Sequence, residues 1–290
     1  MTDQLLAGVA RVDITPPVGI SMAGYYARKG VSVGVERPLT ATALVLTNGA
    51  VKIAVLACDL IFLQSPDVDR LRSAIAAAIG SEAGNILLNF SHTHCGPTPP
   101  SWGLHDDERQ QAIQRTYFAN LDSVLVGAVI MADQNLVPAR VGSGSGSCRI
   151  GINRRELDTD GKVFLGENPD GPLDAEVGVI RVDRRDGSPL ALLFSYGCHT
   201  VTMGPKNLRL SPDFPGPARD LIEAATGAKG LYLQGAAGDI NPITGIGAIE
   251  DDTENMTRLG HILGAEAIKT AAQIRTHQKR GPRALFSSLS

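Results

Sequence analysis

The sequence places histidines where a buried strand is expected to end. His92 and His94 follow the apolar run Ile86–Phe90, which predicts a short buried strand, and Gly96-Pro97 then turns the chain. A strand that ends in His-x-His brings two imidazoles to the rim of a sheet, where rigid backbone lets side chains converge on a metal or a substrate. Two solvated loop histidines are the alternative interpretation.

Asp59, His199 and Asp239 also follow apolar runs. If these strand ends meet at one rim with His92 and His94, they form a ligand set that suits zinc, which binds imidazole nitrogen and carboxylate oxygen and leaves one position to water in catalytic sites. Water activated in this way can attack an amide or ester carbonyl. Helix capping and loop hydrogen bonding are the alternative roles of the two aspartates.

An arginine and a cysteine are weaker candidates. Arg154 follows a glycine-serine stretch, and its guanidinium could hold a carboxylate or a developing oxyanion, although a surface arginine is the alternative. Cys95 stands beside His94, but sequence neighbours do not usually form a working nucleophile-base pair, so we assign it no role. The remaining histidines are predicted to have surface or core roles: His105, His261 and His277.

Composition excludes several classes of protein. The chain has 290 residues, of which 43% are hydrophobic and 20% are charged, with a formal net charge of −3. These values are typical of a soluble globular protein and give no electrostatic footprint for nucleic acid. The four cysteines are far apart without a C-x-x-C pair, so neither a disulfide framework nor a cysteine zinc site is expected. No signal peptide or membrane-spanning run is recognisable, which predicts a cytoplasmic protein.

The elements that would position these residues occur in a repeated order. A hairpin is expected from 39–47 and 51–59 around Asn48-Gly49, and a second from 177–182 and 189–196 around Asp186-Gly187. A helical pattern and an apolar strand follow each hairpin: 66–79 with 86–90, and 215–225 with 230–235. The repeat indicates an internal duplication, in which Cys58-Asp59 corresponds to Cys198-His199.

Two long helices complete the prediction, at 108–134 and 254–274. The glycine-serine stretch 142–147 could be a linker but also suits a strand edge or bulge, so we expect one domain over residues 1–290. The loop 22–26 is expected to be a plain surface turn, with approach to a ligand as the alternative. The fold class is α+β, a layered domain of two mixed β-sheets flanked by helices.

Motifs in several places jointly resemble the neutral/alkaline non-lysosomal ceramidases. They are the stretches 8–16, 22–25, 92–97, 152–154, 199–203 and 238–242, which occur in the family's order and cover nearly the whole chain. The resemblance implies a zinc-dependent catalytic domain that cleaves an N-acyl bond, with Zn²⁺ held by His92 and His199. It also implies that His94 and Arg154 handle the substrate or the developing charge. The stretch 238–242 matches a family element implicated in activity, which adds Asp239 and Asn241 to the catalytic candidates.

The sequence departs from the family pattern at several points. The family supplies a Glu and a Tyr as further zinc ligands from beyond the matched part, so the chain is expected to lack the family's C-terminal portion, to use Asp59 or Asp239 instead, or to have an incomplete site. Asn241 replaces a serine, and Cys95 stands where serine is usual. The expected partner is a small-molecule or lipid-like amide or ester, and no oligomeric state is indicated. The alternative function is a non-catalytic relative that binds a ligand or partner.

Overall fold

The structure, a computed structural model, describes residues 4–26, 28–102, 107–244 and 252–278. These residues form an α+β domain, as the sequence predicts. In chain order, the helices and strands are β1 (Leu6–Asp13), β2 (Gly34–Val35), β3 (Thr40–Thr47), β4 (Lys52–Cys58), α1 (Ser65–Ile79), β5 (Ile86–Phe90), α2 (Glu108–Gln134), β6 (Val137–Ser147), β7 (Gly151–Leu157), β8 (Val163–Asn168), β9 (Glu176–Arg184), β10 (Pro189–Tyr196), β11 (Arg209–Leu210), α3 (Pro215–Thr226), β12 (Lys229–Gln234), β13 (Ile240–Pro242) and α4 (Thr253–Gln273).

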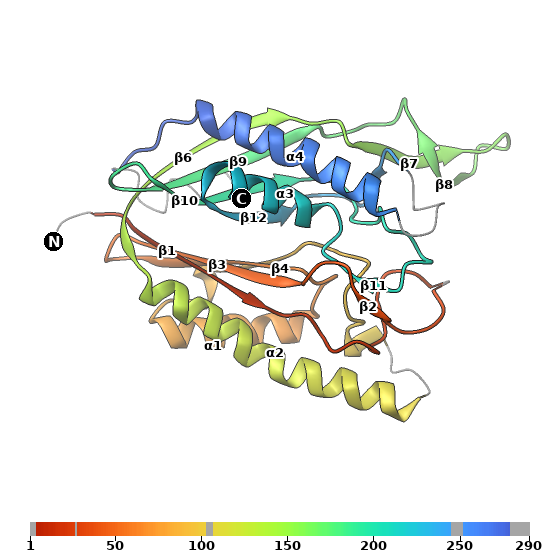
Figure 1. Cartoon of the computed structure of the whole chain (residues 1–290), viewed down its shortest axis with the longest axis horizontal. Coiled ribbons are helices and arrows are strands. Elements are labelled where there is room, and N and C mark those ends of the chain that lie inside the picture. Colours follow the sequence, from red (N-terminus) through yellow and green to blue (C-terminus); the bar gives the residue numbers. More distant parts are fainter. Residues whose placement is uncertain (1–3, 27, 103–106, 245–251, 279–290) are drawn as a thin grey trace.

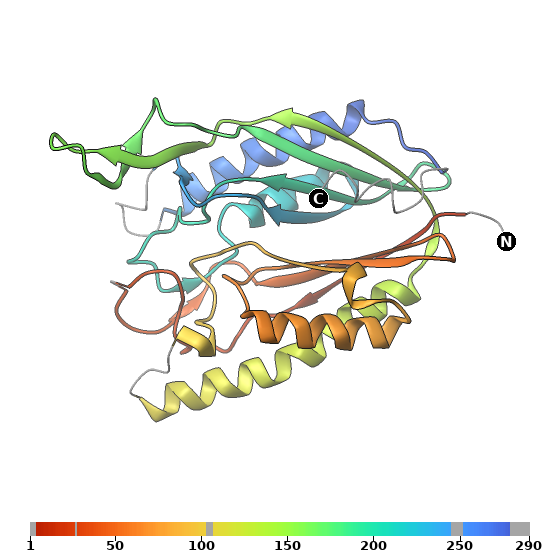
Figure 2. The ribbon, with the colours of Figure 1, turned by 180° about the vertical axis from the view of Figure 1, so that it is seen from behind.

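Two sheets lie face to face between two layers of helices (Figures 1 and 2). The main strands are hydrogen-bonded in the order β12-β10-β9-β6-β1-β3-β4-β5, and the chain of strands folds over where the short ladder Leu6↔Pro138 and Ala7↔Val137 joins β1 to β6. Helices α1 and α2 cover the sheet of β1, β3, β4 and β5, whereas α3 and α4 cover the other sheet.

Both faces of the central strands are buried, which explains their continuous apolar sequences. In β3, Ala43 and Val45 pack toward α1 and α2, while Leu44 and Leu46 belong to the core between the sheets. Successive side chains of a strand point to opposite faces, so a strand between a helix layer and a second sheet needs apolar residues at every position.

The chain repeats one arrangement, as the sequence predicts. The first half runs β1-β3-β4-α1-β5-α2 and the second β6-β9-β10-α3-β12-α4. In each half a hairpin is followed by a helix and then by a parallel strand, β5 beside β4 and β12 beside β10. The outer strands β5 and β12 also meet, because the Asn89 side chain donates to Gln234 O at 3.2 Å and accepts from Gln234 N at 2.8 Å.

The glycine-serine stretch 142–147 is part of β6 and pairs with β9 along its length. Its glycines allow the chain around α4 to approach closely. A Cβ at Gly142 would lie 2.5 Å from Arg275 O, and one at Gly146 would lie 2.1 Å from Glu266 Oε1. The stretch 142–147 is therefore a strand that packs closely against the chain around α4, and it is not a linker.

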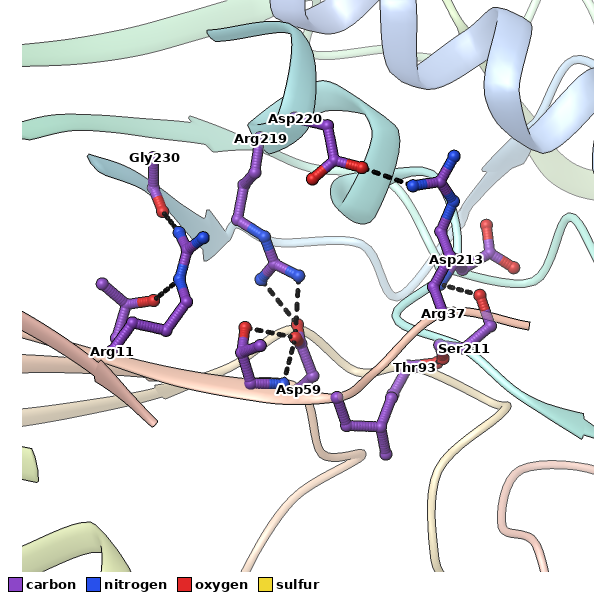
Figure 3. A network of polar contacts seen from close by, with 12 residues as sticks. Arg11, Arg37, Asp59, Thr93, Ser211, Asp213, Arg219, Asp220 and Gly230 are labelled. Carbon is purple, nitrogen blue, oxygen red and sulfur yellow. Dashed lines mark hydrogen bonds and ion pairs between the residues drawn. The ribbon is translucent and has the colours of Figure 1, made fainter. Parts of the chain in front are cut away.

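Charged side chains of the first half reach across to the second (Figure 3). Arg11 of β1 donates to Gly230 O at 2.8 Å, and Arg37 pairs with Asp220 of α3. Asp59, directly after β4, pairs with Arg219 of α3. Helix α3 thus receives two ion pairs from the first half. Among the residues with described structure, no helix is both long enough and apolar enough to cross a membrane.

Candidate metal centre

Three histidines from the two halves converge at one rim of the sandwich. His92 and His94 follow β5, and His199 follows β10. Their rings lie edge to face, with centroid separations of 5.1 Å between His92 and His94, 4.9 Å between His92 and His199, and 5.7 Å between His94 and His199. One ring nitrogen of each can be chosen so that all three atoms lie within 4.8 Å of one another.

His92 is held in an unusual backbone conformation. Its φ is +59°, a left-handed value that costs a non-glycine residue about 1–3 kcal/mol. The segment after β4 supports it, because His92 N donates to Leu60 O and Nδ1 lies 3.0 Å from Ile61 O. A carbonyl can only accept, so Nδ1 carries the proton and Nε2 has a free lone pair. His92 also lines the cavity beside its ring.

His199 is anchored in the same way by the second half. Its Nδ1 lies 2.6 Å from Ala237 O and 3.2 Å from Ile240 O, and its backbone N donates to Ile240 O at 3.0 Å. The proton therefore belongs on Nδ1, which again leaves Nε2 as a lone-pair donor. The two anchored histidines have the same tautomer although their anchors come from different halves.

His94 differs, because both of its ring nitrogens are buried without a hydrogen-bond partner in the described part of the chain. Its ring is fixed by packing, with the edge-to-face ring of Tyr25 at 5.0 Å. Two unpaired buried nitrogens are costly unless a ligand or an ion satisfies them. His94 therefore marks where a bound group is expected.

The loop 22–26 packs on His94 together with Arg28 and is more than the surface turn expected from sequence. Gly24 lies so close that a Cβ there would be 2.3 Å from His94 Cγ, and its φ of +99° also favours glycine. Arg28 lies over the Tyr25 ring at 4.7 Å and donates to His94 O at 2.7 Å. Tyr25 Oη donates to Val201 O at 3.1 Å. The loop thus packs on a candidate site residue, and the alternative interpretation, approach to a ligand, stays a prediction.

The site keeps its imidazoles neutral. Burial, with added repulsion from His92, His199, Arg28 and Arg154, lowers the pKa of His94 to about 2. Burial and the charge of Arg154 lower the pKa of His199 to about 4. Burial likewise lowers the pKa of His92. Neutral imidazoles are the form that binds metal ions.

Arg154 lies beside the histidines on β7. It lines a cavity of about 490 Å³ together with His92 and His199. Its Nη2 donates to Gly238 O at 2.8 Å, and Nη1 donates to Asn241 Oδ1 at 3.4 Å. The rest of the cavity wall combines apolar side chains with polar groups of both halves: Ile61, Leu88, Asn89, Phe90, Gln234, Gly235, Ala237 and Gly238.

Asp239 and Asn241 lie one step behind this arginine. The Asp239 carbonyl accepts from Arg154 N at 2.7 Å, and its carboxylate accepts from Asn153 Nδ2 at 3.2 Å. Asn241 is 2% exposed and contacts the guanidinium. The structure therefore brings both residues to Arg154, where they hold β7 and its side chain.

Asp59 does not join this rim as the sequence suggested. Its carboxylate accepts from Arg219 Nη1 at 2.8 Å and Nη2 at 2.7 Å, and it also accepts from the backbone N and the hydroxyl of Thr40. The side-chain exposures of Asp59 and Arg219 are 0% and 6%. This carboxylate is neutralised by an ion pair that no local sequence pattern indicates.

The residues without an assigned role behave as expected. Cys95 is fully buried, and burial raises the pKa of its thiol to about 12, which excludes a thiolate nucleophile at neutral pH. His261 and His277 are exposed. His105 lies outside the described residues.

The donor set fits zinc. Zinc accepts imidazole nitrogen, and histidines that bind it almost always donate their second nitrogen to a carbonyl or carboxylate. His92 and His199 meet this condition through backbone carbonyls, whereas His94 has no such anchor. The first two therefore have the form of metal ligands, and His94 has that of a residue facing a bound group.

Comparisons with known proteins point to one family. Residues 5–258 match the family model described as neutral/alkaline non-lysosomal ceramidase, N-terminal. The chain is 26% identical over 265 residues to neutral ceramidase B of Dictyostelium discoideum, covering 83% of this chain and 36% of that protein. It is 28% identical over 179 residues to neutral ceramidase A of the same organism, covering 55% of this chain and 24% of that protein.

Solved structures share the fold. A ceramidase complexed with C2 aligns with a TM-score of 0.73 at 22% identity, covering 93% of this chain and 44% of that chain. Neutral ceramidase from Pseudomonas aeruginosa aligns with a TM-score of 0.73 at 21% identity, covering 93% and 45%. The chain thus spans less than half the length of these relatives. Because the family match includes both halves and all three histidines, this chain belongs to the neutral/alkaline non-lysosomal ceramidase family.

Proposed function

We propose that this domain is a zinc-dependent hydrolase that cleaves the amide bond of N-acyl, ceramide-like lipids. The observation that carries the proposal is the pair His92 and His199, whose Nδ1 atoms are each occupied by a backbone carbonyl and whose Nε2 lone pairs are free beside one cavity. Family membership supports the substrate class.

His92 and His199 would hold the zinc ion. Bound zinc would supply Lewis acidity, which activates water toward a carbonyl carbon. Arg154 is held by Gly238 and Asn241 beside the same cavity, and its guanidinium stabilises the negative charge that develops on the carbonyl oxygen. Asp239 and Asn241 keep Arg154 in place.

His94 acts as a neutral imidazole. Its pKa of about 2 disfavours the protonated form. A neutral imidazole offers one donor and one acceptor nitrogen, and the two unpaired ring nitrogens of His94 would orient the substrate through hydrogen bonds. Ile61, Leu88 and Phe90 form an apolar side of the cavity, which suits the hydrocarbon next to an amide and favours a lipid-like molecule over a polar one.

Metal content is the first test. Protein purified without chelator is analysed by mass spectrometry beside the His92→Ala, His199→Ala variant and a His261→Ala control, which changes an exposed histidine of α4. We expect near one zinc per chain in the wild type and the control and near zero in the double variant. Equal zinc in all three proteins would contradict the assigned ligands.

Turnover is the second test. The same proteins are assayed on N-acyl sphingoid, simple amide and ester substrates, with chelator and after zinc is restored. We expect hydrolysis of the N-acyl lipid that chelation abolishes and zinc restores. Zinc binding without turnover of any substrate would favour the other function, a ligand-binding relative of the enzymes.

A further inference from the structure

The two histidine-bearing segments belong to different halves, and one residue connects them directly. Thr200 follows His199 and is fully buried. Its Oγ1 donates to Ser91 O at 3.0 Å, and its carbonyl accepts from His94 N at 3.3 Å. Ser91 and His94 lie on either side of His92 in the sequence. Thr200 therefore forms hydrogen bonds to the first half on both sides of His92.

Other contacts hold each ring within its own half. His92 is anchored by Leu60 and Ile61, while His199 is anchored by Ala237 and Ile240. These bonds set the direction of each ring but not the separation of the halves. Tyr25 and Arg28 also cross between the halves, and they reach the second segment beyond Thr200, at Val201 O and Gly204 O. Thr93 and Cys95 cross as well, but both bond to Ser211, eleven residues after Thr200.

Threonine suits this position physically. Its branched Cβ restricts the side chain to few rotamers, so the direction in which the hydroxyl points is restricted too. Removal of the hydroxyl leaves the Ser91 carbonyl without this donor, and an unsatisfied buried acceptor is costly. The Thr200 side chain is thus a stiff link between Ser91 and the segment that carries His199.

We propose that Thr200 is a positioning residue that sets the spacing between the His92 and His199 nitrogens, and so the zinc affinity of the site. This rests on the proposed function. Partners outside the ligand shell typically change metal affinity by about 10–100-fold, and Thr200 is not itself expected to touch the ion or the substrate.

Three variants test the role. Thr200→Val keeps the branched shape and removes the hydroxyl, and Thr200→Ser keeps the hydroxyl. Thr47→Val is the matched control, because Thr47 is also buried and donates to a carbonyl, Val51 O, at 2.9 Å in the β3–β4 hairpin. Thr200→Ala replaces the valine variant if that protein does not fold.

Zinc affinity is measured by competition with a chromophoric chelator, beside the melting temperature. We expect Thr200→Val to bind zinc about tenfold more weakly, and Thr200→Ser and Thr47→Val to remain within about threefold of the wild type. The two valine variants should lose similar amounts of thermal stability. Equal zinc affinity in both valine variants would overturn the proposal.

A second readout needs no metal. The histidine rings lie edge to face at 4.9–5.7 Å, so their NMR resonances respond to small changes in spacing. In metal-free protein, Thr200→Val should shift the ring signals of His92 and His199, and Thr47→Val should not. If the wild type binds no zinc, the proposed function fails, and the ring signals alone then decide the role of Thr200: unshifted signals refute it.

Discussion

The two halves of the domain share one arrangement but carry different chemistry at equivalent strand ends. In the first half, β4 is followed by Asp59, which pairs with Arg219, and β5 is followed by His92 and His94. In the second half, β10 is followed by His199, and β12 leads to the Gly238 carbonyl that holds Arg154. Each half therefore contributes one anchored histidine. The first half also contributes the Asp59 carboxylate that pairs with Arg219, and the second half contributes the Gly238 carbonyl that holds Arg154.

The difference shows that the repeated backbone puts residues at equivalent positions in the two halves. The type of each side chain then determines which contacts it makes there. Asp59 and His199 follow corresponding strands, yet Asp59 turns to a buried arginine and His199 turns to the cavity. The candidate centre exists because the halves are unequal. Substitutions that act on one half or on the contacts between them can test this.

The largest effect is expected at the ion pair between the halves. Asp59→Asn leaves the Arg219 charge buried without its partner, which should lower the free energy of unfolding by about 3–5 kcal/mol. Urea denaturation measures it. The control Asp122→Asn breaks the exposed pair of Arg70 and Asp122 and should cost at most about 1 kcal/mol.

A double variant sharpens this result. Asp59→Leu with Arg219→Met replaces the pair by apolar side chains, which commonly restores stability. If Asp59→Asn alone is as stable as Asp122→Asn, the pair does not hold the halves as the structure indicates.

The next effect tests the chemistry of the second half. Arg154→Ala should lower kcat by about 100-fold or more, as the loss of an oxyanion donor does, with zinc content unchanged. Arg155→Ala is the matched control, because Arg155 is exposed and also reaches Gly238 O, at 3.4 Å. Similar losses in both variants would remove Arg154 from the reaction.

A smaller effect tests the support of His94 in the first half. Gly24→Ala and Gly19→Ala both place a side chain at positive φ, +99° and +97°. Only the Cβ at position 24 meets His94, whereas a Cβ at position 19 would have no atom within 4 Å apart from those of its chain neighbours. The strain common to both should cost about 1–2 kcal/mol, and the clash should add about 1–3 kcal/mol in Gly24→Ala. Equal stability of the two variants would show that the loop does not press on His94.

The smallest effect is expected on the free energy of unfolding at acidic pH. The folded pKa of His94, about 2, lies below the value of about 6.5 for an unfolded histidine, so the unfolded chain binds more protons. The stabilising contribution is present above about pH 6.5 and is lost as pH falls, with a slope near 1.4 kcal/mol per pH unit. The lowered pKa values of His92 and His199 add to this slope. Urea denaturation of metal-free protein from pH 7 to 5 should therefore show at least this slope, and His94→Gln should reduce it by about the contribution of one histidine.

Much of the fold follows from local patterns. The helix expected over 108–134 begins and ends as predicted, with Asp107 accepting from Arg109 N and Gln110 N at its start, because amphipathic spacing and a capping residue are local signals. Both hairpins appear with their expected turns. Strand β8 and the pairing of β13 with β7 were not predicted. Strand β8 is largely exposed and β13 has only three residues, so neither has a clear pattern of alternating apolar residues.

The site was predictable where chemistry follows a strand end and unpredictable where it depends on distant partners. His92, His94 and His199 meet as expected. The partner of Asp59 lies 160 residues away in sequence, and no local pattern indicates which way its side chain turns. The same holds for loop 22–26, whose glycine indicates a turn but does not indicate that His94 packs against it.

The short ladder between β1 and β6 has a consequence for the order of folding. Each half encloses its own hairpin, helices and parallel strand, and contacts between residues close in sequence form with the least loss of chain entropy. The ladder that joins the halves has only Leu6↔Pro138 and Ala7↔Val137, so each half is expected to form first and to dock afterwards. Capture of an ion by His92 and His199 would then occur only in the docked state and would slow its unfolding.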